Sequence, residues 1–379
     1  MTSPLSPYLP FTRPDLDERA IAAAVAVLRS GWLTSGPRVV EFEAALSAYH
    51  GGRPVRVVNH ATAALEIALR ACKVGPGDEV ITPALSFVAT ANVIMRVGAR
   101  PVFVDVDLDT RNIDVGQIEA AITPRTKAIL PVHFAGLSVD VDRIHSIAQR
   151  HSLRVIEDAA HAIGSASKGR RIGSFGDLAC FSFHANKNIT TIEGGAIVGG
   201  SAEEVAALER LRFHGLQKSG PDAFEVEEAA GKANLSDVSA AIGLAQLPRL
   251  DAFNAARRAL VARYFERWAS SAPVHLPARG DEGHAWHMFA PLLPVDERGI
   301  NRAAFIKAMA ARGIGVGVHY PAIHLFAVYR RLGYVPGQFA NAERIGRETV
   351  TLPLFPTMTL DDVDRVVDAV PAALEEAQS

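Results

Sequence analysis

The chain has 379 residues, which is too long for one small core and indicates two domains, or one large domain with a smaller one appended. Its formal net charge is −2 and like charges do not cluster, so the sequence carries no electrostatic footprint for nucleic acid or for an anionic membrane. Its two cysteines, Cys72 and Cys180, each lie in an apolar segment, which predicts buried thiols and excludes a disulfide framework or a zinc site.

The N-terminal stretch "MTSPLSPYLPFTRPD" has neither the basic region nor the apolar region of a signal peptide. Further along the chain, no apolar run approaches the roughly 18 residues of a membrane-spanning helix. We therefore expect a cytoplasmic protein with no membrane partner.

Short β-branched runs alternate with helix-like stretches from about residue 55 to residue 200. Strands are expected at 55–59, 79–83, 101–106, 127–133, 154–159, 179–183 and 195–199. These runs are almost continuously apolar, so helices should cover both faces of the sheet. The alternation predicts an α/β fold with a mostly parallel central sheet.

After residue 235 the pattern becomes mainly helical. A helix is expected to begin with Ser236 or Asp237 as its N-cap and to break or kink near Pro248. Strand-like runs at 288–295 and 313–320 and helices near 302–312 and 360–376 follow. We predict a large domain over residues 1–249 and a smaller α+β domain over residues 250–379.

Ligands of open parallel sheets bind outside the carboxyl ends of the strands, so polar residues at the predicted strand ends are candidates for a site. After the first strand, Ala61 and Thr62 begin a helix whose open N–H groups would favour an anion such as phosphate, although Thr62 could equally be a plain N-cap. Phe87 follows the second strand and could stack on a flat ring or pack in the core.

The run at 154–159 ends in two acids, Glu157 and Asp158, and His161 follows. A carboxylate at this position could pair with a protonated ring nitrogen, which is the partner that a pyridoxal cofactor needs. A helix-capping or salt-bridged acid is the alternative, and His161 could be a structural hydrogen-bonding residue.

The stretch "FSFHANKNITTIEGG" places Lys187 just after a strand end, with Ser182 and His184 beside that end. A lysine in a partly apolar pocket has a lowered pKa and becomes a nucleophile toward a carbonyl group, whereas an exposed lysine is a solvated charge. The Gly194–Gly195 pair permits a close backbone approach.

Together, an anion cradle, an aromatic residue, a ring-nitrogen acid and a nucleophilic lysine on successive strand ends predict a pyridoxal phosphate site. A dinucleotide-binding dehydrogenase is the alternative among α/β enzymes. It would need G-x-G-x-x-G after the first strand, and "NHATAALE" does not supply that motif.

The chain resembles the fold-type I aminotransferases and, more narrowly, the DegT/StrS-type sugar aminotransferases over almost its whole length. The segments that carry the resemblance include "VNHATAALEIAL", "GDEVITPALSFVATAN", "VIEDAAHAIGS", "FSFHANKNITTIEGGAI", "KANLSDVSAAIGLAQL" and "HAWHMF". Within the family, "ITPRTKAI", "SFHANKNIT" and "LPLFPTMT" are most similar to the aminotransferases that make UDP-4-amino-4-deoxy-L-arabinose for lipid A modification.

The resemblance implies a role for each matching residue. Lys187 would bind pyridoxal 5′-phosphate covalently and move protons, and Asp158 would face the pyridine nitrogen. The other implied cofactor contacts are Ala61, Thr62 and Ser182 at the phosphate, Phe87 on the ring face, His161 near the ring oxygen, and Asn234 at the phosphate of a neighbouring subunit. The role of Asn234 implies a homodimer with shared active sites. The implied lining of the sugar-nucleotide cleft is His319, Tyr320 and His324.

The expected reaction takes the amino group of glutamate, leaves 2-oxoglutarate and pyridoxamine phosphate, and then aminates the keto group of a nucleotide-linked sugar, with UDP-4-keto-pentose as the expected substrate. Another UDP- or dTDP-linked 3- or 4-keto-hexose is the alternative substrate, and a regulatory protein that only binds the cofactor is the alternative outside enzymes. One branch of the family has histidine in place of the lysine and dehydrates sugars, so Lys187 indicates transamination.

Overall fold

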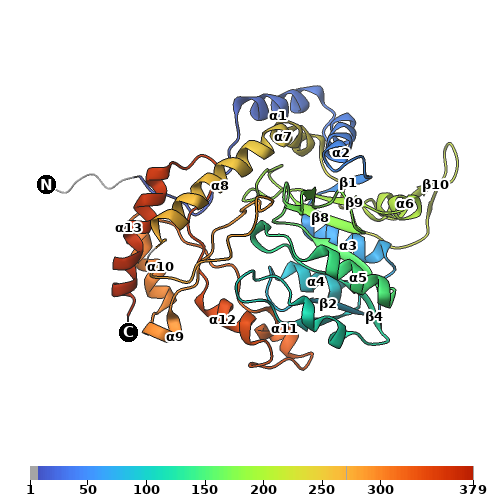
Figure 1. The fold of residues 1–379 in the computed structure, drawn as a ribbon. Helices are drawn as coiled ribbons and strands as arrows, with labels where there is room; N and C mark the ends of the chain where they lie inside the picture. The colour runs from blue at the N-terminus through green and yellow to red at the C-terminus, as the bar shows by residue number, and fades with distance from the viewer. Residues whose placement is uncertain (1–6, 270, 379) are drawn as a thin grey trace.

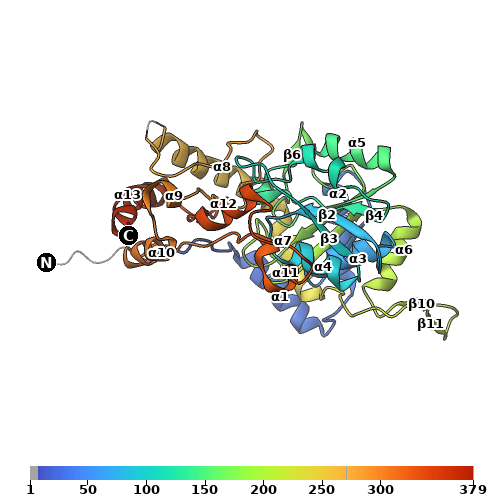
Figure 2. The ribbon, with the colours of Figure 1, turned by 90° about the horizontal axis from the view of Figure 1, so that it is seen from below.

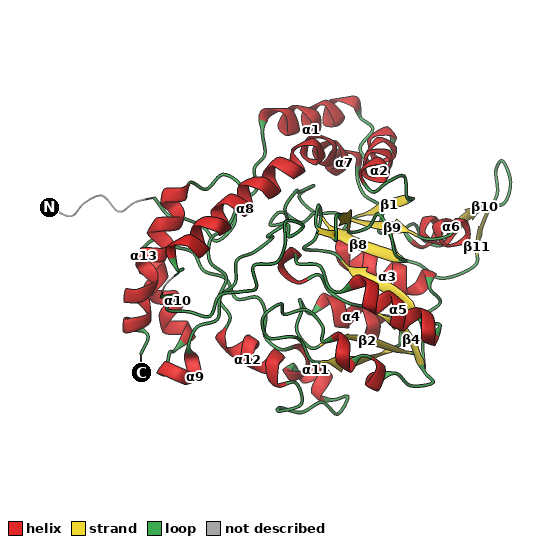
Figure 3. Cartoon of the chain, viewed as in Figure 1, coloured by secondary structure: helices red, strands yellow, loops and turns green. Residues whose placement is uncertain are grey.

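The computed structural model describes residues 7–269 and 271–378, and within them a seven-stranded sheet forms the centre of the fold (Figures 1 and 3). Its strand order is β1-β9-β8-β5-β4-β2-β3. The strands are β1 (Val55–Val58), β2 (Glu79–Pro83), β3 (Arg100–Val104), β4 (Thr126–Ile129), β5 (Arg154–Asp158), β8 (Leu178–Ser182) and β9 (Gly195–Gly199). Only β9 runs against its neighbours β1 and β8, so the prediction of a mostly parallel sheet is confirmed.

Both faces of the sheet are buried. Successive side chains of each strand point to opposite sides, so neighbouring residues of a strand pack in different cores. Val155 belongs to a core that includes residues of α2 (Pro37–Tyr49) and α5 (Val141–His151). Its neighbour Ile156 belongs to a second core, against α3 (Ala61–Ala71), α4 (Ala89–Arg96) and α6 (Ala202–Leu211). Each fully buried aliphatic side chain contributes about 1.5–3 kcal/mol, which explains why the strands are almost continuously apolar.

Two N-terminal helices were not predicted from the sequence, and the second of them packs against β1. They are α1 (Glu18–Ser30) and α2, and both contact α7 (Asp237–Gln246). Ser236 is the N-cap of α7, because its hydroxyl accepts the N–H of Ser239. Asp237 instead caps α2 from a distance of about 200 residues along the chain, accepting the N–H groups of Gly36 and Val39 at 2.7 and 3.1 Å.

The helix α8 (Leu250–Arg267) links two hydrophobic cores, and Figure 1 shows it running from α7 toward α13 (Leu360–Glu376). Leu250 and Phe253 pack in the core of the sheet, whereas Leu260 and Tyr264 pack with α13 and with α10 (Arg302–Ala311). As predicted, Pro248 interrupts the helical run, within a 3-10 turn at Leu247–Arg249. The domain boundary after residue 249 stays a prediction.

The prediction of regular strands at 288–295 and 313–320 is wrong. Within these segments the described chain forms only isolated bridges, such as those of Phe289 with Leu352 and Gly317 with Thr351. Two prolines in the first segment, Pro291 and Pro294, remove backbone donors that a ladder would need.

Several short elements complete the described fold. The helices α9 (Val295–Arg298), α11 (Ala327–Arg330) and α12 (Ala340–Glu348) lie in the C-terminal part. Two small ribbons, which the sequence analysis did not predict, are β6 (Ala166–Ser167) with β7 (Arg170–Arg171) and β10 (Leu216–Lys218) with β11 (Phe224–Val226). The β10–β11 hairpin extends away from the body of the molecule beyond α6 (Figure 2).

Cys72 and Cys180 are buried and unpaired, as predicted. None of the helices within the described residues is long and apolar enough to cross a membrane. The cytoplasmic location stays a prediction.

Candidate active site

A cavity of about 320 Å³ opens at the carboxyl edge of the sheet. This volume falls within the range of about 300–1,000 Å³ that is usual for small-molecule sites. The structure brings most of the predicted residues together in its lining, namely Ala61, Thr62, Phe87, Asp158, His161, Ser182, Lys187, His319 and Tyr320. The loops that follow β1, β2, β5 and β8 therefore converge on one site, together with the segment that carries His319 and Tyr320.

A larger hollow of about 750 Å³ lies elsewhere, among residues of α3, α4 and α6. Its charged side chains neutralise one another, as in the ion pairs Arg70–Glu228 and Arg96–Glu66 at 2.9 and 2.6 Å. It contains none of the predicted site residues. Among the described residues, no group of three or more His, Cys, Asp or Glu side chains is placed to hold a metal ion.

Lys187 follows β8 and is partly buried where it lines the cavity. Removal from water lowers the pKa of its amine from 10.5 to about 8, while the charge of Asp158 opposes this shift. At pH 7, a pKa of about 8 leaves about one amine in ten neutral, against about one in three thousand for an ordinary lysine. Lys187 can therefore act as a nucleophile, which an exposed lysine could not do at the same rate.

Asp158 ends β5 and is 5% exposed. Its Oδ2 accepts the hydroxyl of Thr90 at 2.8 Å, and its Oδ1 accepts the N–H of Ala160 at 3.1 Å. Burial raises the pKa of this carboxyl group, although both hydrogen bonds and the nearby charge of Lys187 favour the ionised form. The carboxylate is thus held in place beside the cavity, where a cationic partner would stabilise it.

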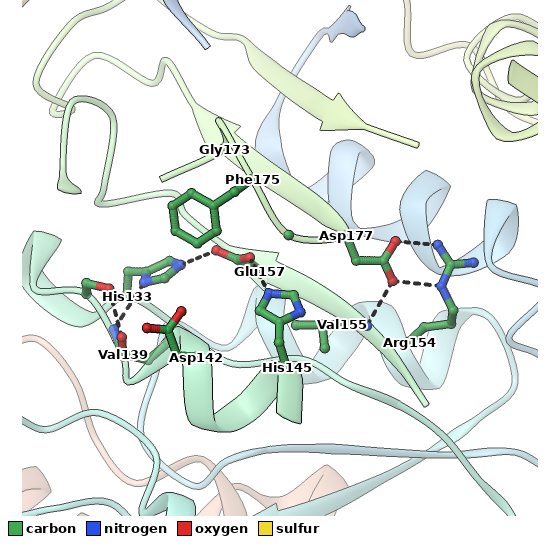
Figure 4. Close-up of polar contacts among 12 residues, drawn as sticks. His133, Val139, Asp142, His145, Arg154, Val155, Glu157, Gly173, Phe175 and Asp177 are labelled. Carbon is green, nitrogen blue, oxygen red and sulfur yellow. Dashed lines mark hydrogen bonds and ion pairs between the residues drawn. The ribbon is translucent and has the colours of Figure 1, made fainter. Parts of the chain in front are cut away.

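The neighbouring acid, Glu157, points toward His133 and His145 (Figure 4). Because successive side chains of a strand alternate, this is the face opposite to that of Asp158. Glu157 Oε2 lies 2.8 Å from Nε2 of His133, and its Oε1 lies 3.3 Å from Nε2 of His145. His133 Nδ1 accepts the N–H of Val139, so the ring proton is on Nε2 and is donated to Glu157. Of the two acids at the end of β5, Asp158 is therefore the one that faces the cavity.

We expect Glu157→Gln to lower the free energy of unfolding at pH 7 by roughly 1–3 kcal/mol, because an amide cannot accept hydrogen bonds from both histidines. Burial alone would raise the pKa of Glu157, but the hydrogen bonds of His133 and His145 outweigh it and lower the pKa to about 2, below the ordinary 4.5. The stabilisation by Glu157 is thus complete when the pH is well above the ordinary pKa of 4.5, and it is lost as the pH falls toward the lowered pKa of about 2.

Urea unfolding at a series of pH values measures this effect. The wild-type protein should lose stability between the ordinary carboxyl pKa and the lowered one, and Glu157→Gln should lose less over the same interval. Equal stability of the two proteins at pH 7 would contradict the role of Glu157.

The N-terminus of α3 forms an anion cradle at the cavity. His60, and not Thr62, is the N-cap, because His60 Nδ1 accepts the N–H of Ala63 at 2.9 Å. The interpretation of Thr62 as a cap is therefore wrong, and within the described residues the N–H groups of Ala61 and Thr62 have no recorded partner. The second glycine of the Gly194–Gly195 pair is required for a close backbone approach, because a Cβ on Gly195 would lie 2.7 Å from the nitrogen of Ala61.

A stack of rings closes another side of the cavity. The His161 ring lies nearly parallel to those of His287 and Tyr320, with ring centroids 4.5 and 6.1 Å away. The Tyr320 hydroxyl lies 3.3 Å from His161 Nε2, and His161 Nδ1 is buried without a partner in the described residues. Burial lowers the pKa of His161 well below 6.5 and that of His319 to about 4, so these rings are neutral at pH 7.

Three predicted residues lie differently. His324 is fully buried and bonds to Glu343 at 2.9 Å, so it does not line the cavity and its predicted substrate role is corrected. Asn234 also lies outside the lining and donates to Ser35 at 2.6 Å. Phe87 is at the cavity but remains 53% exposed, so the alternative of core packing is wrong.

The residues present fit the predicted cofactor. The cavity offers free N–H groups for a phosphate, an amine of lowered pKa for an aldehyde, a buried carboxylate for a ring nitrogen, and unused hydrogen-bonding capacity on His161. Thr90 and His287 were not predicted from the sequence. Both lie in segments that carry the family resemblance, "SFVATAN" and "HAWHMF", but no local pattern distinguishes them from other residues of those segments.

Comparison with known proteins agrees with this geometry. The model of the DegT/DnrJ/EryC1/StrS aminotransferase family matches residues 14–371. The chain is similar to Spr1654 of Streptococcus pneumoniae, named as a sugar aminotransferase and solved in its PMP form, with 33% identity, a TM-score of 0.90, and coverage of 97% of this chain and 100% of that chain. The same protein is also solved in a PLP form.

Two further solved structures have comparable similarity. PseC of Helicobacter pylori, an aminotransferase involved in the biosynthesis of pseudaminic acid, has 30% identity and a TM-score of 0.91, with coverage of 97% of this chain and 99% of that chain. DesV of S. venezuelae has 34% identity and a TM-score of 0.89, with the same coverage of both chains.

Proposed function

Because the chain belongs to the DegT/DnrJ/EryC1/StrS aminotransferase family, we propose that it transfers the amino group of glutamate to the keto group of a nucleotide-linked sugar. The protein is a sugar aminotransferase that depends on pyridoxal 5′-phosphate. The observation that carries the proposal is the presence of a lysine of lowered pKa and a buried aspartate in the lining of one cavity.

When bound, the cofactor supplies an electron sink for breaking the C–H bond of the amino donor. The N–H groups of Ala61 and Thr62 and the hydroxyl of Ser182 would bind its phosphate, and Asp158 would hold a proton on its ring nitrogen. Lys187 Nζ, as a neutral amine, would hold the cofactor through its aldehyde carbon, with the aldehyde oxygen leaving as water. When the amino donor frees this amine, Nζ would act as the base that takes the α-proton of glutamate. The same amine would serve the sugar half-reaction in reverse, which predicts ping-pong kinetics.

For the sugar, we propose UDP-4-keto-pentose, converted to UDP-4-amino-4-deoxy-L-arabinose for lipid A modification. The support is the likeness of "ITPRTKAI", "SFHANKNIT" and "LPLFPTMT" to the enzymes of that reaction. A UDP- or dTDP-linked 3- or 4-keto-hexose is the second candidate. Its support is that PseC, which serves the biosynthesis of a different sugar, is 30% identical to the chain over nearly its full length.

A screen of substrates tests this proposal. The purified protein is incubated with glutamate and, in separate reactions, with UDP-4-keto-pentose, UDP-4-keto-hexose and dTDP-4-keto-hexose, and the amino sugar is measured by mass spectrometry. We expect the pentose to react fastest. Turnover of a hexose while the pentose is inert would replace the first candidate by the second, and 2-oxoglutarate formation without any amino sugar would contradict both.

We also propose that two copies of the chain form a dimer with shared active sites. Within the described lining of the cavity, Lys187 is the only lysine or arginine, which leaves the phosphates of a nucleotide sugar without their usual cationic partners. Asn234 Oδ1 is buried without a described partner. Large apolar side chains are exposed in neighbouring segments, at Trp32, Leu33, Ile192 and Phe213. Light scattering should give twice the mass of one chain, and the mass of a single chain would contradict the dimer.

A further inference from the structure

A chain of hydrogen bonds runs from the helix α8 to the amine of Lys187. Asn254, on α8, accepts the side-chain N–H of Asn188 at 2.7 Å. Asn188 Oδ1 lies 3.1 Å from Nδ1 of His287, and His287 Nε2 lies 3.4 Å from Nζ of Lys187. Asn188, Asn254 and His287 are 4%, 1% and 8% exposed, so water does not compete freely for these contacts.

Two backbone carbonyls fix the direction of this chain. Asn254 donates through Nδ2 to the carbonyl of Ile163 at 3.2 Å, so its Oδ1 must be the acceptor toward Asn188. Asn188 uses its Nδ2 for Asn254 and for the carbonyl of Ala285 at 2.9 Å, so its Oδ1 must face His287. An amide oxygen only accepts, and therefore the proton of the neutral His287 ring is on Nδ1.

The other ring nitrogen, Nε2, is then a bare acceptor directed at Lys187. Burial lowers the pKa of His287 well below 6.5, and the nearby Lys187, His161, Arg257 and His319 lower it further, so the ring does not gain a second proton at pH 7. A bare acceptor can bind an N–H of the lysine but cannot donate to the lysine lone pair.

We propose that His287 is a positioning residue for Lys187. Its Nε2 accepts one N–H of the lysine whenever that amine is free, which fixes Nζ and leaves the amine lone pair available to the cavity. Asn188 and Asn254 hold His287 in the tautomer that makes this possible. The inference rests on the nucleophilic role of Lys187 but not on the identity of the sugar.

A role of His287 as a base toward the lysine ammonium is a poorer match to the site. The pKa of Lys187 is about 8, and that of His287 lies well below 6.5, so a proton would move from the histidine to the lysine. The charged and titratable groups that act on His287 are Lys187, His161, Arg257 and His319, and each of them disfavours a protonated imidazole. Asp158 acts on Lys187, where it favours the charged amine. Burial raises the pKa of Tyr320, so this hydroxyl is neutral.

The two amide substitutions of His287 form a matched pair for the test. In His287→Asn the short amide retains a donor near the position of Nδ1, so the contact with Asn188 is kept and the contact with Lys187 is lost. In His287→Gln the longer amide can place its oxygen near the position of Nε2. The measured quantity is the rate at which acetic anhydride acetylates Lys187 in the full chain freed of cofactor, followed by peptide mass spectrometry from pH about 6 to about 10.

We expect His287→Asn to slow acetylation of the neutral Lys187 amine by roughly tenfold or more, since small errors in the placement of a reacting atom are costly. His287→Gln should stay within about threefold of wild type. Lys73, whose side chain is 84% exposed, gives the reference rate within the same protein. A rate for His287→Asn equal to wild type, or a rate for His287→Gln as low as that for His287→Asn, would overturn the proposal.

The pH profile separates positioning from proton transfer. A positioning defect persists above pH 9, where wild-type Lys187 is already neutral. The loss of a base that deprotonates Lys187 matters only below the lysine pKa of about 8. A defect of His287→Asn that disappears above pH 9 would therefore overturn the positioning role.

If His287→Asn fails to fold, Asn188→Ser provides a second test. It removes the acceptor of Nδ1, so the ring can shift its proton to Nε2 and donate into the lysine lone pair, and acetylation should slow although His287 is intact. Unchanged reactivity in a folded Asn188→Ser protein would overturn the proposal. Acetylation needs no sugar, so a failure of the substrate screen leaves this result unaffected.

Discussion

Lys187→Ala is expected to lower the rate of amino-sugar formation by at least about 10⁴-fold, because the substitution removes both the nucleophile and the group that moves the proton. The amine is suited to both tasks because burial lowers its pKa to about 8. The alanine variant should still bind pyridoxamine phosphate through the phosphate cradle at α3, which needs no lysine. The measurement is the amino-sugar yield per enzyme in a single cycle and in repeated cycles.

The exposed Lys73 provides the matched control. Its side chain is 84% exposed, and its ion pair with Glu203 spans 3.6 Å between two exposed groups, which contributes almost nothing to stability. Lys73→Ala should therefore keep the wild-type rate. Substantial turnover by Lys187→Ala, or borohydride reduction that leaves position 187 unlabelled in the wild-type protein, would remove the proposed mechanism.

The pH dependence of the wild-type rate follows from the same amine. Lys187 is reactive when neutral, and its pKa is lowered from 10.5 to about 8, so the rate should rise as the pH increases toward 8 and level off above it. A rate that continues to rise to pH 10 would show that the lysine is solvated like an ordinary one.

Asp158→Asn is expected to lower the rate by roughly 10²–10³-fold, the usual loss on removal of one electrostatic contact with the reacting group. The carboxylate would hold a proton on the ring nitrogen of the cofactor, whereas an amide carries no charge with which to do so. Asparagine has nearly the same shape, and its oxygen can still accept the N–H of Ala160. Its NH₂ group cannot accept from Thr90 but can donate to that hydroxyl, which also accepts, so the cavity should keep its form. The measurement is the rate of the glutamate half-reaction in a single turnover.

Glu157→Gln is the control for this variant. Glu157 is the next residue of the same strand, but it bonds to His133 and His145 on the opposite face of the sheet. We expect it to lower stability and to leave the single-turnover rate near the wild-type value under conditions where the protein is folded. Equal rate losses in Asp158→Asn and Glu157→Gln would show that the loss arises from disturbance of β5 and not from the ring nitrogen.

The sequence alone determined the parallel sheet and the place of the site. Near-continuous apolar strands require two covered faces, and a parallel sheet gathers its carboxyl ends at one edge, so Ala61, Asp158, Ser182 and Lys187 had to lie near one another. A cap at Ser236 or Asp237 and a break near Pro248 were also predictable, because each depends on the chemistry of one residue and its immediate neighbours. The structure selects Ser236, since Asp237 is used by the distant helix α2.

Only the tertiary structure decided which side chains enter the cavity. The alternation along β5 shows that Glu157 and Asp158 face opposite ways, but the faces are assigned by the packing of α4 and α5 against the sheet. His287 reaches Lys187 from 100 residues away along the chain. The bonds that hold His287 in place, to Asn188 and from Asn188 to Asn254, join residues 99 and 66 positions apart. His324 is buried against Glu343 for the same kind of reason. Local patterns record hydrogen bonds and packing between near neighbours, and contacts between distant segments form only when the whole chain has folded.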